Sequence, residues 1–190
     1  KDSFTEAISL KNVGYEYGNF KLQNISFDIK VGKKYIIVGG NGTGKSTLLK
    51  LIAGYLKPQA GNILIDGKDI NDVDYSDLIS YIDQNDHIFK ENIEKNITVY
   101  NSYKYERQKY MDLSLKINHI LNSTRSNCQK MSGGERQIIS LLRAISKEGD
   151  ILLMDEPFSA VDYERASILT NAITTNKIFK SKTVVMITHN

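Results

Sequence analysis

The glycine-rich stretch "GGNGTGKST" at residues 39–47 constrains the fold more than any other part of the chain. It contains the P-loop pattern Gly-x-x-x-x-Gly-Lys-Ser in full, and it directly follows the apolar run "KYIIV" at 34–38, which is typical of a buried strand. In a P-loop, successive backbone N–H groups converge on phosphate oxygens, and the dipole of the following helix favours the same negative charge. The sequence therefore predicts a strand, a phosphate-binding turn and a helix in direct succession.

Each side chain of the loop has a predicted task at a bound nucleotide. The Lys45 ammonium should reach the β- and γ-phosphates of ATP, the Ser46 hydroxyl should bind Mg²⁺, and the Thr47 hydroxyl can donate to a phosphate. A chance glycine-rich turn is the alternative, and the full pattern between a strand and a helix makes it a poor explanation. The residues predicted to bind the nucleotide here are Gly39, Asn41, Gly42, Gly44, Lys45, Ser46 and Thr47.

Strand patterns recur on both sides of the P-loop. "AISLKNVGYEY" at 7–17 and "KLQNISFDI" at 21–29 alternate as half-buried strands do, whereas "DILLMDEP" at 150–157 and "KTVVMIT" at 182–188 contain continuous apolar runs. Strands that alternate with helices indicate a parallel α/β sheet.

Helical patterns lie between these strands. The helix after the P-loop is expected to extend to Leu56 and to end at Pro58 and Gly61, and further helices are expected from Gly134 and at 162–173. The intervening polar segment, rich in Asn, Lys and Tyr, contains the helical patterns "ENIEKNI" and "KYERQKYMDLSLKINHIL". The predicted fold class is α/β, a P-loop NTPase core with a mainly parallel sheet, an N-terminal antiparallel β part and an inserted helical subdomain. The predicted domains are an ATP-binding core at 1–85 and 147–190 and a helical subdomain at 86–146.

Composition is that of an ordinary globular chain and narrows the function classes. The net charge of +3 comes from scattered lysines and is too small to indicate nucleic acid as a partner. No apolar run approaches the roughly 18 residues that span a bilayer. The single cysteine, Cys128, excludes an intrachain disulfide and is interpreted as a small apolar core residue. Because the chain starts at Lys1 rather than Met, we expect a processed or excised piece.

Two acids end the predicted strand at "ILLMDEP". The end of a buried strand is where a sheet presents side chains to a ligand crevice. We expect Asp155 to hold Mg²⁺ through water and Glu156 to accept a proton from the attacking water as general base. The alternative is a pair of solvated acids that cap a strand.

The stretch "MSGGERQ" at 131–137 looks like a second anion-binding element. Ser132 is placed as a helix N-cap, and Gly133 and Gly134 would expose backbone N–H groups at the positive end of the helix dipole. A plain helix cap is the alternative. A chain that already has a P-loop needs no second anion-binding element for the same nucleotide, so this stretch requires a separate explanation.

Taken together, the motifs resemble the nucleotide-binding domain of an ATP-binding cassette (ABC) transporter of the exporter type. "MSGGE" at 131–135 corresponds to the family signature Leu-Ser-Gly-Gly-Gln. The other family motifs follow in the family's order and cover essentially the whole chain: the P-loop, a lone Gln84, the signature, "ILLMDEP", "SAVD" at 159–162 and "TH" at 188–189.

The resemblance explains the second anion-binding element at 131–137. Domains of this family pair head to tail in the presence of ATP, and each ATP lies between the P-loop of one copy and the signature of the other. Ser132, Gly133 and Gly134 would then hold the nucleotide of a second nucleotide-binding domain. The resemblance also implies a transmembrane domain as partner and a position at the cytoplasmic face of the cell membrane.

Further roles follow only from the resemblance. Tyr17 corresponds to the aromatic residue that stacks on adenine, although core packing would explain either Tyr17 or Tyr15. Gln84 corresponds to the glutamine that contacts Mg²⁺ and the attacking water, and His189 to the histidine that contacts the γ-phosphate. Asp162 corresponds to the acid that crosses the dimer seam.

One signature residue departs from the family pattern. Glu135 replaces the family's glutamine, and because a carboxylate beside a γ-phosphate is unfavourable, we expect its side chain to point away from ATP.

The leading hypothesis is an ATPase that drives a membrane transporter, with an exporter favoured. One alternative is a soluble ABC ATPase that acts on ribosomes or DNA; that class carries two cassettes or a long coiled-coil insertion. Another is a catalytically inactive ATP-binding regulatory module, which the intact Glu156, His189 and Ser132 argue against.

Overall fold

The structure, a computed structural model, describes residues 3–113 and 117–189. Within this part the chain forms two compact units. The first, here called the sheet unit, contains the chain up to Tyr81, Asp150–Asp155 and the chain from Ser181 onward. The second, here called the helix unit, contains Ile82–Gly149 and Glu156–Lys180. The division into an ATP-binding core and a helical subdomain stays a prediction.

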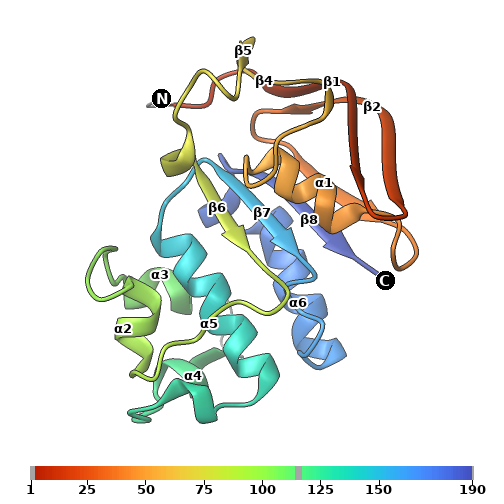
Figure 1. Cartoon of the computed structure of the whole chain (residues 1–190). Coiled ribbons are helices and arrows are strands. Elements are labelled where there is room, and N and C mark those ends of the chain that lie inside the picture. The colour runs from red at the N-terminus through yellow and green to blue at the C-terminus, as the bar shows by residue number, and fades with distance from the viewer. Residues whose placement is uncertain (1–2, 114–116, 190) are drawn as a thin grey trace. The chain divides into compact units, whose positions relative to one another are not determined.

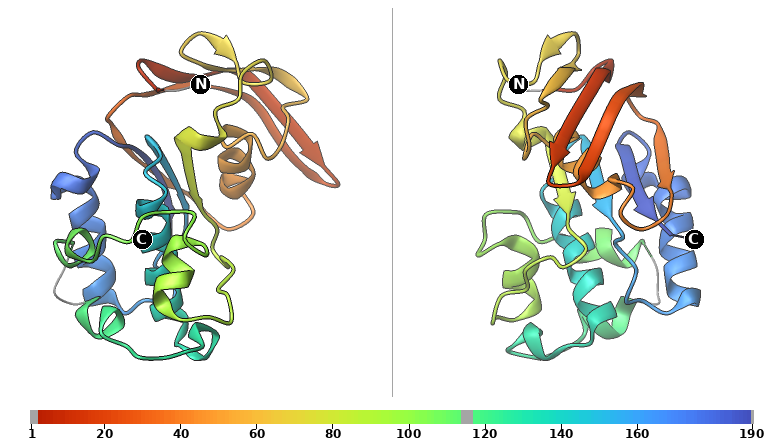
Figure 2. Two further views of the ribbon diagram at one scale, coloured as in Figure 1. Left: turned by 90° about the vertical axis from the view of Figure 1, so that its left-hand side faces the viewer. Right: turned by 45° about the vertical axis from the view of Figure 1, so that its right-hand side comes forward.

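An antiparallel sheet forms the N-terminal part of the sheet unit (Figures 1 and 2). Strand β1 (Ala7–Tyr17) pairs with β2 (Phe20–Lys30) on one side and with β4 (Ala60–Ile65) on the other, and the short β5 (Lys68–Asp69) pairs with β4. A two-residue turn that begins at Gly18 joins the first two strands, and Gly18 has a φ of 57°. Glycine adopts this left-handed conformation without a steric penalty, which keeps the hairpin turn tight. The predicted antiparallel β part is confirmed.

The second sheet of this unit contains the strand before the P-loop. Its order is β3 (Lys34–Val38), β8 (Thr183–Thr188), β7 (Ile151–Asp155) and β6 (Ile79–Ile82), and β3 and β7 each pair with β8 in parallel. This confirms the predicted mainly parallel sheet. The prediction that the run at 34–38 is a buried strand is wrong: β3 lies at the edge of the sheet, and Ile36 and Val38 are 54% and 65% exposed.

The register of the parallel pairs aligns three strand ends. Val38 lies opposite Thr188, and Asp155 lies opposite Ile187. Because parallel strands present their carboxyl ends at one edge, the segments that follow β3, β7 and β8 all start from that edge.

Helix α1 (Lys45–Ile52) follows the P-loop and is shorter than the sequence pattern suggests. The expected extension to Leu56 is wrong. Gly54, at a φ of 76°, ends the helix: its N–H donates to the Leu51 carbonyl, and the Tyr55 N–H donates to the Lys50 carbonyl. These two bonds form a Schellman motif, which satisfies the last carbonyl groups before Pro58 and Gly61 are reached.

The apolar core of the sheet unit lies between α1 and the two sheets. Buried side chains from both sheets and from α1 belong to one cluster, which includes Leu10, Ile29, Leu49, Ile63 and Ile187.

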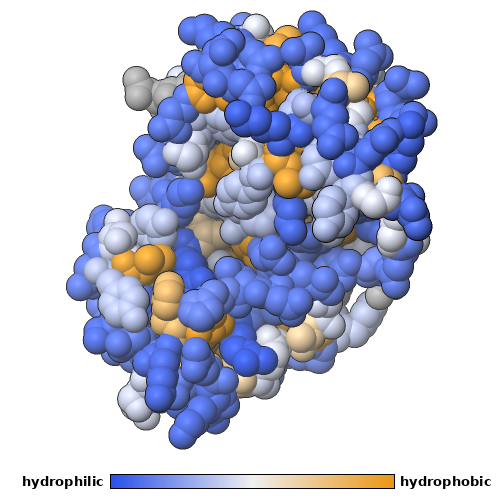
Figure 3. Space-filling view, viewed as in Figure 1, coloured by the Kyte–Doolittle hydropathy of each residue, from blue (hydrophilic) through white to orange (hydrophobic). Residues whose placement is uncertain are grey.

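On the face shown in Figure 3, hydrophilic residues cover most of the surface and apolar residues form small separate patches.

The helix unit contains two longer helices, of 14 and 13 residues, and several shorter ones (Figure 1). Residues 114–116, within the predicted helical pattern at 104–121, lie outside the described part of the chain, and on either side of them the pattern forms α3 and α4. The pattern at 91–97 forms α2. The helices are α2 (Ile93–Thr98), α3 (Arg107–Met111), α4 (Asn118–Leu121), α5 (Gly133–Ser146) and α6 (Tyr163–Thr175), with 3₁₀ turns at Cys128–Lys130 and Lys177–Phe179.

A buried asparagine organises this unit. Asn96 is fully buried in α2, and its amide donates to the carbonyl groups of Phe89, Glu91 and Asn92 at 3.0–3.1 Å. Its side-chain oxygen accepts from the Phe89 N–H at 2.8 Å and from the Arg143 guanidinium at 3.2 Å. Arg143 lies on α5 and also stacks over the Phe89 ring. Hydrogen bonds of one side chain thus connect the segment before α2 to helix α5.

We predict that Asn96→Ala lowers the free energy of unfolding by about 2–4 kcal/mol, because partly buried backbone groups before α2 and the Arg143 guanidinium lose a hydrogen-bond partner at once. Urea denaturation would measure the change. The matched control is Asn171→Ala on α6, where the side chain is exposed and the change should stay within about 0.5 kcal/mol. Equal effects of the two substitutions would contradict this role.

Candidate functional site

The P-loop encloses its own lysine side chain. The Lys45 ammonium donates to the carbonyl groups of Gly39 and Gly40, both at 2.7 Å, and Thr43 Oγ1 donates to Gly40 at 2.9 Å. A Cβ atom on Gly39 would lie 3.3 Å from Thr43 Oγ1 and 3.7 Å from Lys45 Cδ. Because a side chain at residue 39 would enter the space that the loop encloses, the geometry fits a backbone cradle for an anion.

Gly44 is required where the loop becomes helix α1. It has a φ of 93°, and a Cβ atom there would lie 2.3 Å from Phe20 Cζ and 3.0 Å from Leu22 Cδ2. Phe20 begins β2 and lies opposite Tyr17. The turn end of the β1–β2 hairpin therefore packs against the start of α1. Sequence reasoning did not identify Phe20, because no local pattern indicates a contact between residues so far apart along the chain.

The two candidate tyrosines of β1 differ in exposure. Tyr17 is 78% exposed, whereas Tyr15 is half-buried and packs against the apolar core. Core packing thus accounts for Tyr15 and leaves the Tyr17 ring available to a planar ligand. Stacking of Tyr17 on adenine stays a prediction.

The carboxyl edge of the parallel sheet gathers further predicted residues. Asp155 ends β7 and is 3% exposed, while His189 follows β8 and Ser46 lies in the first turn of α1, both exposed. In the described ranges 3–113 and 117–189, no three His, Cys, Asp or Glu side chains form a metal-binding group. A cation here would use hydroxyl, carboxylate, phosphate and water oxygens, which is the donor set that suits Mg²⁺.

Glu156 contacts another predicted residue within the helix unit. It follows directly after β7 with a φ of 46°, a left-handed conformation that is unfavourable for a residue with a side chain. The Gln84 amide donates to Glu156 Oε2 at 3.0 Å. The two side chains predicted to act on the attacking water are therefore direct neighbours, although 72 positions separate them.

The signature stretch begins helix α5 with a capping box. Ser132 Oγ accepts from the Glu135 N–H at 3.2 Å, and the Glu135 carboxylate accepts from the Ser132 N–H at 2.9 Å. The predicted N-cap at Ser132 is confirmed. The N–H groups of Gly133 and Gly134 lie in the same first turn, where a helix supplies no carbonyl acceptors. Glu135 uses its carboxylate on the backbone of its own helix.

Asp162 caps helix α6. Its carboxylate accepts from the Arg165 N–H at 3.0 Å and lies 3.4 Å from the Arg165 guanidinium. The local contacts thus explain this acid as a helix cap, and its place at a dimer seam stays a prediction.

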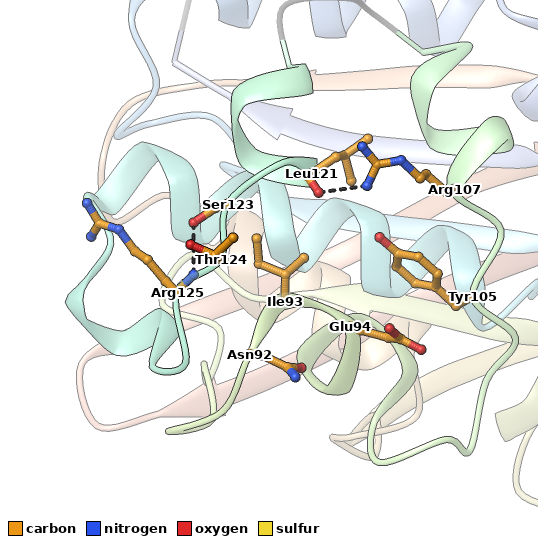
Figure 4. Close-up of a pocket in the computed structure, with 9 residues that line it drawn as sticks. All are labelled: Asn92, Ile93, Glu94, Tyr105, Arg107, Leu121, Ser123, Thr124 and Arg125. Atoms are coloured by element: carbon orange, nitrogen blue, oxygen red, sulfur yellow. Dashed lines mark hydrogen bonds between the residues drawn. The ribbon is translucent and has the colours of Figure 1, made fainter.

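Two hollows of the helix unit differ in their relation to the predicted residues. One, of about 610 Å³, is lined by residues that include Gln84, Gly133 and Gln137. Another, of about 290 Å³, is shown in Figure 4, where Arg107 donates to the Leu121 carbonyl at 2.8 Å. No predicted site residue lines the hollow of Figure 4. Of these two hollows, only the one lined by Gln84 and Gly133 therefore belongs to the candidate site.

Comparisons with known proteins agree with these motifs. A family model described as "ABC transporter" matches residues 22–159. The chain is 32% identical to an ATP-dependent lipid A-core flippase of Vibrio parahaemolyticus serotype O3:K6, a match that covers 96% of this chain and 34% of the flippase. It is 36% identical to the molybdate/tungstate import ATP-binding protein WtpC of Methanocaldococcus jannaschii, over 96% of this chain and 62% of that protein.

A solved structure supports the same relationship. A bacterial Atm1-family ABC exporter with ATP bound superposes with a TM-score of 0.83 and 26% sequence identity, over 98% of this chain and 35% of the exporter chain. The chain thus spans about a third of the length of the flippase and of the exporter. Among the described residues, no helix is both long and apolar enough to cross a bilayer.

We predict that Glu135→Ala costs about 1 kcal/mol of folding stability at neutral pH through loss of the capping box. The hydrogen bond from the Ser132 N–H lowers the pKa of the Glu135 carboxyl, while partial burial opposes the shift. A depressed folded-state pKa stabilises the fold fully above the unfolded value of about 4.5, and this contribution is lost as pH falls through the folded value.

Urea denaturation at neutral and acidic pH would check this. The difference in the free energy of unfolding between wild type and Glu135→Ala should become smaller on acidification. Glu135→Gln, which keeps a side-chain acceptor without the charge, should differ from Glu135→Ala by an amount that does not depend on pH. A gap that widens in acid would refute the capping role of the carboxylate.

Proposed function

The chain belongs to the ABC transporter family, and on that premise we propose that it is the ATP-hydrolysing domain that powers a membrane exporter. The observation that carries the proposal is the P-loop cradle, which starts from the sheet edge where β7 ends in the buried Asp155. Such an edge can bind the phosphates and the cation of ATP side by side.

Lys45 and the loop backbone would bind the β- and γ-phosphates. The Lys45 ammonium already lies against the carbonyl groups of Gly39 and Gly40, so it is held at the loop rather than in solvent. Ser46, Asp155 and Gln84 would hold Mg²⁺, which when bound supplies positive charge to the phosphates.

Glu156 would act as general base. The water oxygen forms a bond to the γ-phosphorus, the bond from that phosphorus to the β–γ bridging oxygen breaks, and the Glu156 carboxylate accepts the proton of the water. The amide of Gln84 contacts the same carboxylate and would orient it. His189 would contact the γ-phosphate, and Tyr17 would stack on the adenine.

A second copy of the domain would complete each site. Ser132 caps a helix whose first N–H groups, at Gly133 and Gly134, suit the γ-phosphate of an ATP bound to the opposite P-loop. Asp162 would lie at the seam of this head-to-tail pair. A transmembrane domain would receive the resulting motion at the cytoplasmic face of the membrane.

Export as the direction rests on the relatives. Lipid A-core flippases and an exporter structure match nearly the whole chain. In addition, the stretch "HIFKENIEKNITVY" at 87–100 resembles the sequence that follows the corresponding glutamine, here Gln84, in exporters. WtpC, an import protein, shares the same domain, so transport assays in both vesicle orientations are the direct test. These transporter matches favour membrane transport over action on ribosomes or DNA.

Glu156→Gln should keep ATP binding and lower the hydrolysis rate about 10²- to 10⁴-fold, because an amide cannot accept the proton of water. We expect an ATP-dependent dimer that outlasts that of the wild type in size-exclusion chromatography. Lys45→Ala is the contrasting variant, since loss of the ammonium should weaken ATP binding itself. Wild-type phosphate release from Glu156→Gln would rule out the general-base role.

Ser132→Arg tests the two-copy site. The long side chain should block the partner's γ-phosphate, so each copy should retain ATP affinity but fail to hydrolyse. Mixing this variant with Lys45→Ala puts both defects into one composite site of a mixed dimer and leaves the other site whole. Partial return of hydrolysis on mixing is expected. Loss of ATP affinity in Ser132→Arg as severe as in Lys45→Ala would assign the signature to its own chain's nucleotide instead.

A further inference from the structure

Gln137 lies one turn into helix α5 and bonds to a loop far away in the sequence. Its side-chain oxygen accepts from the Ala160 N–H at 2.8 Å, and its amide donates to Ser159 Oγ at 2.9 Å. The same amide lies 3.5 Å from the Gln84 carbonyl oxygen. Half-buried Gln137 therefore contacts both the segment after Glu156 and the segment of Gln84.

These contacts close a ring that includes the proposed general base. The Ser159 N–H donates to the Glu156 carbonyl at 3.3 Å, and the Gln84 amide donates to the Glu156 carboxylate at 3.0 Å. The ring thus leads from Gln137 through Ser159 to the backbone of Glu156, and through Gln84 to its side chain. All of these residues belong to the helix unit.

Close packing fixes the start of α5 against the same loop. A Cβ atom on Gly134 would lie 2.7 Å from the Ala160 carbonyl oxygen and 3.2 Å from Val161 Cα, and one on Gly133 would lie 3.2 Å from Ala160 Cβ. Backbone atoms cannot yield as a flexible side chain can, so Gly134 in particular has no room for a methyl group. The hydrogen bonds of Gln137 therefore act on a loop that is already in tight contact with the signature.

From this arrangement we infer that Gln137 is a positioning residue, which orients Glu156 for proton acceptance by tying the loop after it and the Gln84 segment to the signature helix. The inference rests on the proposed function, because it takes Glu156 as the general base. It follows that displacement of the signature helix would reach Glu156 through hydrogen bonds within one chain.

The test is ATP hydrolysis by the full-length protein carrying Gln137→Met, which keeps side-chain length and removes the hydrogen bonds. We expect a loss of about tenfold or more in kcat, because small misplacements of a catalytic group are costly, with equilibrium ATP affinity within about twofold of wild type. Gln137→Glu keeps the acceptor for Ala160 N–H and can accept from the Ser159 hydroxyl but cannot donate to the Gln84 carbonyl, so it should recover only the part of the rate that depends on the loop after Glu156. Gln108→Met, on the exposed face of α3, is the matched control and should match the wild type in both measurements.

A combination with Glu156→Gln separates positioning from general structural damage. If Gln137 acts through Glu156, adding Gln137→Met to Glu156→Gln should change single-turnover hydrolysis by less than about twofold. The same loss in both backgrounds would overturn the inference, as would a wild-type rate in Gln137→Met. Should Gln137→Met not fold, Ser159→Ala removes one hydrogen bond of the ring from the other side and must lower kcat without weakening ATP binding.

The proposed function can fail separately. If wild-type hydrolysis survives Lys45→Ala, the proposed ATPase site is wrong whatever Gln137 does. If hydrolysis depends on Lys45 but not on Gln137, only the positioning role of Gln137 is contradicted, and the proposed function stands.

Discussion

The parallel register of β3, β7 and β8 is the constraint on which the chemistry of the sheet unit depends. Because Val38 lies opposite Thr188 and Asp155 opposite Ile187, three strands end together. A buried acid, a histidine and a glycine-rich loop, which come from distant parts of the sequence, therefore all start from one edge. A slip of one residue in the β7–β8 pair would turn every side chain of the shifted strand to the opposite face and change the position of the acid at that edge.

The glycines of this chain serve packing as much as ligand binding. Sequence reasoning assigns Gly44 and Gly134 to phosphate contact, since glycine lets backbone N–H groups approach an anion. The structure adds a steric reason: a methyl group at Gly44 would collide with Phe20, and one at Gly134 with the backbone of Ala160. A glycine in such a motif can be obligatory for two independent reasons, and its replacement would not by itself reveal which reason matters.

Local patterns predicted the parts of the fold that depend on neighbouring residues. The start of α1 at Lys45, the N-cap at Ser132 and the buried strands β7 and β8 follow from spacing and residue type, and the structure confirms them. The buried strand predicted at 34–38 is wrong, because an apolar run alone does not distinguish an edge strand from a central one. The pattern places the end of α1 too late, because Gly54 stops the helix before Pro58 is reached. The hydrogen bonds of Gln137 and the contact between Asn96 and Arg143 depend on partners that folding brings together from remote segments, so no local pattern could indicate them. The nucleotide roles of Tyr17, His189 and Asp162 rest on resemblance and stay predictions.

Glu156, the proposed general base, has a backbone conformation that disfavours a residue with a side chain. A left-handed conformation in a residue with a side chain costs about 1–3 kcal/mol, and glycine or asparagine would adopt it more easily. Mutational drift toward either residue would therefore be favoured by folding alone. A cassette with glycine or asparagine at this position would lack the proposed general base and would still be well folded, so selection for a stable fold would not retain the glutamate.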